Sequence, residues 1–205
     1  MRIVKNLIEK NDKTKLVSFI FDQCLDELNY NFFDRIELHI QKENKTWLDL
    51  PNAYVCLNYN NPFIWSEDVK AVKIIMLKQL ISLAIAYRYM DLQIPDFIMD
   101  IMTNRETMQK GYEKDLFYYY YLMLMEHEPH EIQEFDTFMR INTPWLSYYG
   151  FDNYDSEFLK DMVGLFRYNK EFESVTNDLF IALKKDLRIE KNLSVAIATF
   201  NLISR

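Results

Sequence analysis

The stretch SEDVKAVKIIMLKQLISLAIAYRYM, residues 66–90, decides the fold of this chain. Ser66 is a residue type that favours the start of a helix, and Glu67 and Asp68 place negative charge in the first turn, where it suits the helix dipole. At 100° per residue, the apolar side chains that follow cover nearly every direction around the helix axis. A helix that is apolar all round packs on several sides, so the sequence predicts a long central helix from Ser66 to about Met90.

Two short strands are predicted before this helix. Residues 34–40, DRIELHI, alternate polar and apolar side chains with the period of two that is typical of a strand with one buried face. Residues 53–59 indicate a second strand, and the turn-rich residues 43–52 join the two. We expect the polar side chains of the first strand to form a solvated face: Arg35, Glu37 and His39.

Amphipathic helical patterns fill most of the remaining chain. They cover residues 13–29, 96–103, 113–126, 131–142, 156–169 and 174–187. The sequence therefore predicts an α+β fold that is mainly α, with a small antiparallel sheet packed on the central helix and further helices C-terminal to it. We expect a single domain over residues 1–205, with a subdivision near residue 150 left open because that segment is loop-like.

The composition excludes several classes of protein. Of 205 residues, 49% are hydrophobic, and the three glycines are scattered, so neither the dinucleotide-binding fingerprint nor the P-loop is present. A formal charge of -7 makes nucleic acid a poor partner, because binding to it depends on neutralising phosphates. The N-terminus lacks the apolar run of a signal peptide, no stretch is long enough to span a membrane, and two cysteines suit a reducing compartment. We expect a soluble, cytoplasmic protein with no membrane or nucleic-acid partner.

The segment Glu126-His-Glu-Pro-His-Glu131 holds the only pair of neighbouring histidines. A helical zinc motif needs its two imidazoles four residues apart on one face, whereas His127 and His130 are three apart with a proline between them. This spacing favours a polar turn between helices. The alternative is a metal site, for zinc, made by His127, His130 and Glu131.

Polar residues interrupt the central helix at its middle. Lys78, Gln79 and Ser82 lie among apolar neighbours, and a buried lysine is costly unless it is paired. These residues therefore form either a narrow hydrogen-bonded or solvent-facing strip, or the floor of a cleft.

The order of an N-terminal helix, a pair of strands and a long helix with polar groups at its middle resembles the core of the zinc metallopeptidases called zincins. In that family a His-Glu-x-x-His helix packs beneath the sheet, and Lys78-Gln-Leu-Ile-Ser82 stands in the corresponding place. Asp100-Ile-Met-Thr-Asn-Arg-Glu106 is similar to the segment that supplies a third, acidic ligand, with Asp100 or Glu106 as the matching residue. The resemblance covers about residues 13–126 and implies a relative that has lost zinc, because lysine, glutamine and serine cannot replace two imidazoles and a carboxylate.

These observations lead to two competing functional hypotheses. The first is a non-catalytic, zincin-like protein without a cofactor, which acts by binding or assembly through a cleft near Lys78, Gln79, Ser82, Asp100 and Glu106. Its partner would be a protein or a peptide. The rival is a metal-dependent hydrolase that uses the His127 and His130 site. A homodimer or partner surface made by exposed aromatic residues is compatible with the first hypothesis: Trp145, Tyr148 and Tyr149.

Overall fold

The computed structural model describes residues 2–7, 11–30, 34–41, 47–49, 54–58, 68–125, 131–149 and 155–204. The chain divides into two compact units, which we call unit 1 (residues 1–91 and 110–119) and unit 2 (residues 92–109 and 120–205). The prediction of a mainly helical α+β fold is confirmed. The position near residue 150, where a subdivision was left open, falls within the range of unit 2.

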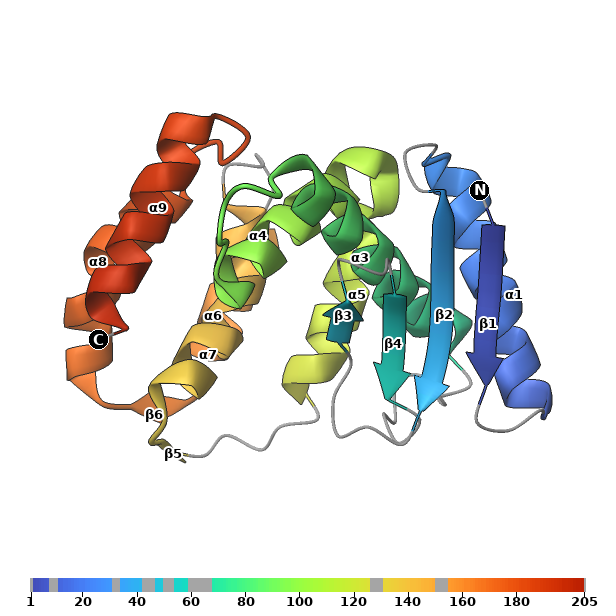
Figure 1. Ribbon diagram of the computed structural model, residues 1–205. Coiled ribbons are helices and arrows are strands. Elements are labelled where there is room, and N and C mark those ends of the chain that lie inside the picture. The colour runs from blue at the N-terminus through green and yellow to red at the C-terminus, as the bar shows by residue number, and fades with distance from the viewer. Residues whose placement is uncertain are drawn as a thin grey trace. The chain divides into compact units, whose positions relative to one another are not determined.

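Unit 1 contains a four-stranded sheet with the strand order β1-β2-β4-β3. Its strands are β1 (Arg2–Leu7), β2 (Arg35–Gln41), β3 (Trp47–Asp49) and β4 (Tyr54–Asn58). Two helices, α1 (Asp12–Leu28) and α3 (Val69–Arg88), contact each other and lie behind the strands in Figure 1. The unit is therefore a two-layer arrangement of helices on a sheet.

The predicted antiparallel pairing is wrong for most of this sheet. β1 pairs with β2 in parallel, β2 pairs with β4 in parallel, and only β3 and β4 run antiparallel. The arrows of Figure 1 show these directions. Two features explain the difference. The helix α1 returns the chain from the end of β1 to the start of β2, as parallel pairing requires. The segment predicted as a turn contains a further strand, β3. Because β3 runs antiparallel to β4, β4 has the same direction as β2.

The central helix predicted from the sequence is present as α3. Most of its side chains are buried, on all sides, from Ala71 to Ala86. Ser66 lies outside the described residues, and Asp68 caps the helix by accepting hydrogen bonds from the backbone N–H groups of Lys70 and Ala71, at 3.0 and 3.2 Å. In the described part of the chain, no helix combines the length and the apolar character that crossing a bilayer demands.

Polar contacts tie the elements of unit 1 together. On α1, Glu27 accepts a hydrogen bond from the hydroxyl of Tyr112, and its Oε1 lies 2.8 Å from the ammonium of Lys73 on α3. Tyr112 ends the segment η1 (Met108–Tyr112), in which the chain kinks between α4 and α5 (Glu113–Met125). The kink is at Gly111, whose φ of +91° is a conformation that L-residues adopt only with strain, so glycine is needed there.

The described residues of unit 2 are mainly helical, with one short pair of parallel strands. Its elements, apart from the end of α5, are α4 (Asp96–Thr107), β5 (Glu131–Ile132), α6 (Phe135–Tyr148), α7 (Asp155–Val163), β6 (Arg167–Tyr168), α8 (Lys170–Leu183) and α9 (Glu190–Ile203). The helix α6 is central: α4, α7 and α8 all contact it, and α9 packs on α8. Figure 1 shows α8 and α9 side by side.

The predicted end of a helix near Asn142 is wrong, because α6 continues through Pro144 to Tyr148. A proline inside a helix removes one backbone hydrogen bond and costs about 3 kcal/mol. Residues 141–148 are all buried, and this packing offsets the cost. Three side chains also hydrogen-bond the carbonyl four residues earlier in α6: Asn142, Thr143 and Ser147.

Candidate functional site

Three residues of the predicted cleft lie on α3 in unit 1. Lys78 and Gln79 are partly exposed, whereas Ser82 is buried. The ammonium of Lys78 lies 5.8 Å from the centre of the Tyr119 ring, within the range of a cation–π contact. Among the described residues, Gln79 Oε1 is buried and has no hydrogen-bond partner. Lys78 and Gln79 therefore reach the surface of α3, whereas Ser82 does not.

The other two residues of the predicted cleft belong to unit 2. Asp100 and Glu106 are both on α4 and are both partly exposed. Burial is the main cause that raises the pKa of the Tyr120 hydroxyl, and the negative charge of the nearby Asp100 raises it further. Since the five residues are divided between the two units, the cleft that would join them stays a prediction.

The alternative metal site also stays a prediction. His127 and His130 lie outside the described residues, and Glu131 begins β5. Among the residues that the structure does describe, no three histidine, cysteine, aspartate or glutamate side chains are placed to hold one ion.

The predicted solvated face of β2 is present only in part, because the side chain of Arg35 is 52% exposed but those of Glu37 and His39 are largely buried. Glu37 is buried, its side chain only 3% exposed. His39 Nε2 lies 2.8 Å from one carboxylate oxygen of Glu37, and Arg35 forms an ion pair with the other. The period of two correctly placed the apolar side chains of the strand in the core, but it did not show that the opposite face is also covered.

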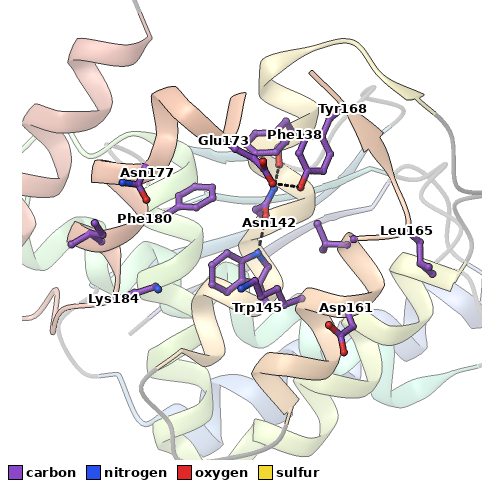
Figure 2. A pocket seen from close by; sticks show the side chains of 14 residues that line it. Phe138, Asn142, Trp145, Asp161, Leu165, Tyr168, Glu173, Asn177, Phe180 and Lys184 are labelled. Carbon is purple, nitrogen blue, oxygen red and sulfur yellow. Dashed lines mark hydrogen bonds between the residues drawn. The ribbon is translucent and has the colours of Figure 1, made fainter. Parts of the chain in front are cut away.

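Unit 2 contains a pocket with a volume of about 570 Å³ (Figure 2). The helices α6 and α8, the end of α7 and the strand β6 supply its walls. The lining residues are Phe138, Asn142, Trp145, Lys160, Asp161, Val163, Gly164, Leu165, Tyr168, Glu173, Asn177, Phe180, Ile181 and Lys184. The sequence predicts a helix as far as residue 169, but α7 ends at Val163. The chain beyond it turns back, so that Gly164 and Leu165 line the pocket and are not part of a helix.

Aromatic rings form the inner wall of this pocket. The rings of Phe138 on α6 and Phe180 on α8 are stacked, with centres 6.3 Å apart, and Trp145 meets Phe180 edge-to-face at 5.8 Å. Tyr168 contacts Phe138 edge-to-face at 4.8 Å. The two rings of an edge-to-face or offset-stacked pair attract each other, which adds to the stabilisation from their buried area. Contacts between rings therefore hold this apolar wall together.

Hydrogen bonds hold the polar groups on this wall in place, as Figure 2 shows. Asn142 Oδ1 accepts a hydrogen bond of 2.7 Å from the indole N–H of Trp145, and its amide donates to the carbonyl of Phe138. The hydroxyl of Tyr168 donates to Glu173 Oε1 at 2.8 Å. Burial, together with the bond to Glu173, raises the pKa of Tyr168 to about 12, so this hydroxyl stays protonated at neutral pH.

Two lysines lie over the aromatic rings at one end of the pocket. The ammonium groups of Lys160 and Lys184 are 5.5 and 5.9 Å from the centre of the Trp145 ring. Lys184 also lies 4.2 Å from the centre of the Tyr149 ring. The two cations therefore converge on one indole, on which cation–π attraction holds them.

Sequence reasoning missed this pocket, although one signal for it exists. Phe138, Asn142 and Trp145 are spaced four and three residues apart, which places an amide on an aromatic face of one helix. Nothing local in the sequence pairs that face with α8, whose nearest contributing residue, Glu173, is 28 positions beyond Trp145.

The aromatic surface predicted for self-association is mostly internal. Trp145 is 6% exposed and Tyr148 is fully buried, and only Tyr149 is exposed. The prediction that these three side chains are exposed is therefore wrong for two of them. The reason is that α4, α7 and α8 contact α6 and residues 141–148 of this helix are all buried.

The pocket offers groups suited to recognition: aromatic and aliphatic surface, two amides, two ammonium groups and two carboxylates. None of its lining residues among those described is a serine, a cysteine or a histidine. Such a set binds a small molecule through apolar contact and orients it through a few polar groups. No protein-family model, no curated protein and no solved structure matches this chain.

Proposed function

We propose that this chain is a non-catalytic binding protein and that the pocket of unit 2 is its ligand site. The observation that carries the proposal is the pocket itself. Its volume of about 570 Å³ lies within the roughly 300–1,000 Å³ of small-molecule sites. All of its walls belong to one compact unit.

The character of the walls supports binding of an apolar ligand. Phe180 is partly exposed and supplies ring surface, and Leu165 and Ile181 line the pocket while they remain exposed to solvent. Apolar side chains that are exposed at a concave site gain free energy when a ligand covers them, at about 25 cal/mol per Å². We infer that this gain drives binding.

The zincin-like relationship remains a proposal for residues 13–126. It is supported by the position of Lys78-Gln-Leu-Ile-Ser82 in a long helix that follows a small sheet. Under this proposal the core has lost its zinc and retains only a structural role. Relatives that carry His-Glu-x-x-His at residues 78–82 would support common ancestry.

Titration with N-phenyl-1-naphthylamine, an uncharged apolar dye whose fluorescence rises in apolar surroundings, tests the proposed binding site. We expect saturable binding of one dye molecule per chain. The substitution Asn177→Trp, at an exposed lining position on α8, places an indole in part of the pocket and should weaken this binding.

Asp178→Trp is the matched control, because Asp178 is the next residue of the same helix, is exposed, and does not line the pocket. This variant should bind the dye as the unmodified chain does. Absence of saturable binding, or equal loss in both variants, contradicts the proposal.

A further inference from the structure

Lys160 and Lys184 form a cationic end of the unit 2 pocket, and no described carboxylate of the pocket pairs with either of them. Among the residues that the structure describes, neither Lys160 nor Lys184 has a carboxylate oxygen within ion-pair distance. Both ammonium groups face the same indole, whose cation–π attraction supplies no formal negative charge. An anionic group of a ligand would supply the charge that the described part of the pocket does not offer to these lysines.

The carboxylates of the pocket do not supply that anion. Glu173 is engaged by the hydroxyl of Tyr168, and Figure 2 shows this pair away from Lys184. Asp161 lines the pocket and is exposed, but it makes no ion pair with either lysine. The cationic end therefore carries a net attraction for a negatively charged group.

The pocket also has exposed apolar lining. Leu165 is 64% exposed and Ile181 is 51% exposed, and both line the pocket. A ligand that meets this surface and also reaches the lysines must have an apolar part and a charged part. The two chemistries are held on the same helix, because Ile181 and Lys184 are three residues apart on α8 and the adjoining turn.

We propose that the ligand of this pocket is a small amphipathic acid, with an apolar body against the aromatic and aliphatic lining and an anionic group at the end that carries Lys160 and Lys184. This inference rests on the proposed function and names the class of molecule that the site takes. A carboxylate or a sulfonate has the charge that the site requires.

A pair of dyes that differ only in charge tests the inference. 8-Anilinonaphthalene-1-sulfonate has the skeleton of N-phenyl-1-naphthylamine with one added sulfonate. We expect Lys160→Met and Lys184→Met each to weaken binding of the sulfonate dye about two- to fivefold relative to binding of the uncharged dye. Added salt should weaken binding of the sulfonate dye alone.

Lys185→Met is the matched control, because it removes the same charge from the next residue, which is exposed and does not line the pocket. Its affinity for both dyes should equal that of the unmodified chain. In a competition arm, 1-naphthoate should displace the sulfonate dye, and the uncharged 1-naphthalenemethanol should do so only at much higher concentration.

The outcomes separate this inference from the proposed function. If both dyes bind, and Lys160→Met and Lys184→Met change the affinity for the two dyes equally, the acidic ligand is ruled out. The proposed binding site is then still supported. Equal displacement by the acid and the alcohol leads to the same conclusion. If neither dye binds to the folded chain, the proposed function fails, and the inference fails with it.

Discussion

Glu37 carries a charge at a buried position on the middle strand of the unit 1 sheet. Removing a carboxylate from water costs several kcal/mol unless partners compensate, and here Arg35 and His39 both contact it. The three residues alternate along β2 and lie on one face. Such a cluster gains little net stability compared with apolar residues, but the loss of one member leaves the others uncompensated.

Glu37→Ala should therefore lower the free energy of unfolding by about 2–4 kcal/mol, because the guanidinium of Arg35 and the ring of His39 lose their acceptor. Urea denaturation measures this change. Asp26→Ala, at an exposed position of α1, is the control and should change the free energy by less than about 0.5 kcal/mol. Equal effects of the two substitutions would show that Glu37 is exposed to water.

Cys24 is a buried thiol, with 0% of its surface exposed, on the inner face of α1. Burial raises its pKa from 9.0 to about 12, so the thiol stays neutral at physiological pH. Because the thiolate is the reactive form, Cys24 is inert as a nucleophile in the folded chain. Its role is packing against α3.

This burial predicts slow labelling of Cys24 by 5,5′-dithiobis(2-nitrobenzoate) at pH 8. In a Cys56→Ser variant, labelling should be slow when the chain is folded and fast in guanidinium chloride. The pKa of this acid is higher in the folded state, so its contribution to stability is complete below pH 9 and is lost as the pH rises from 9 towards 12. Fast labelling of the folded variant would contradict the buried position.

At the scale of elements, Arg105 on α4 joins the ends of two other helices. Its guanidinium donates to the carbonyls of Leu146 at 2.9 Å, Ser147 at 3.3 Å, Leu183 at 2.7 Å and Lys185 at 2.9 Å. The last carbonyls of a helix have no partner within the helix, and a cation suits that end of the helix dipole. One side chain therefore satisfies the C-terminal ends of α6 and α8, the two helices that form the inner wall of the pocket.

Arg105→Met removes these donors while it retains most of the side-chain volume. We expect a loss of about 2–4 kcal/mol in the free energy of unfolding, because several carbonyls are left without a donor. The substitution should also weaken binding of N-phenyl-1-naphthylamine, since α6 and α8 are no longer held together at this end. Arg140→Met, at an exposed position of α6, is the control for both measurements. A variant at residue 105 that is as stable as this control would show that the carbonyls are solvated.

At the scale of the whole molecule, the non-catalytic proposal makes a prediction about metal. The chain purified without a histidine tag should contain no stoichiometric zinc, because no described cluster of ligands holds an ion and the helix at residues 78–82 lacks imidazoles. Elemental analysis measures this content. About one zinc ion per chain that is lost in His127→Ala would overturn the proposal in favour of the metal-dependent hydrolase.

The candidate sites differ in how far the sequence could predict them. The polar strip of Lys78, Gln79 and Ser82 was visible because it interrupts an apolar helix, which is a local pattern. The unit 2 pocket was not visible, because its inner wall brings together Phe138, Trp145 and Phe180 from two helices. Periodicity shows which face of a helix is apolar but not which other helix covers it.

The sequence alone determined the features of this protein that depend on neighbours along the chain. These include the amphipathic helix α1, the strand β2 and the all-round apolar helix α3, because helical and strand periodicities repeat within a few residues. Only the tertiary structure decided the parallel pairing of β1, β2 and β4, the burial of Glu37, the passage of α6 through Pro144 and the pocket of unit 2. Each of these depends on contacts between residues far apart in the sequence. The free energy of such contacts outweighs the local preferences of a charged residue or a proline.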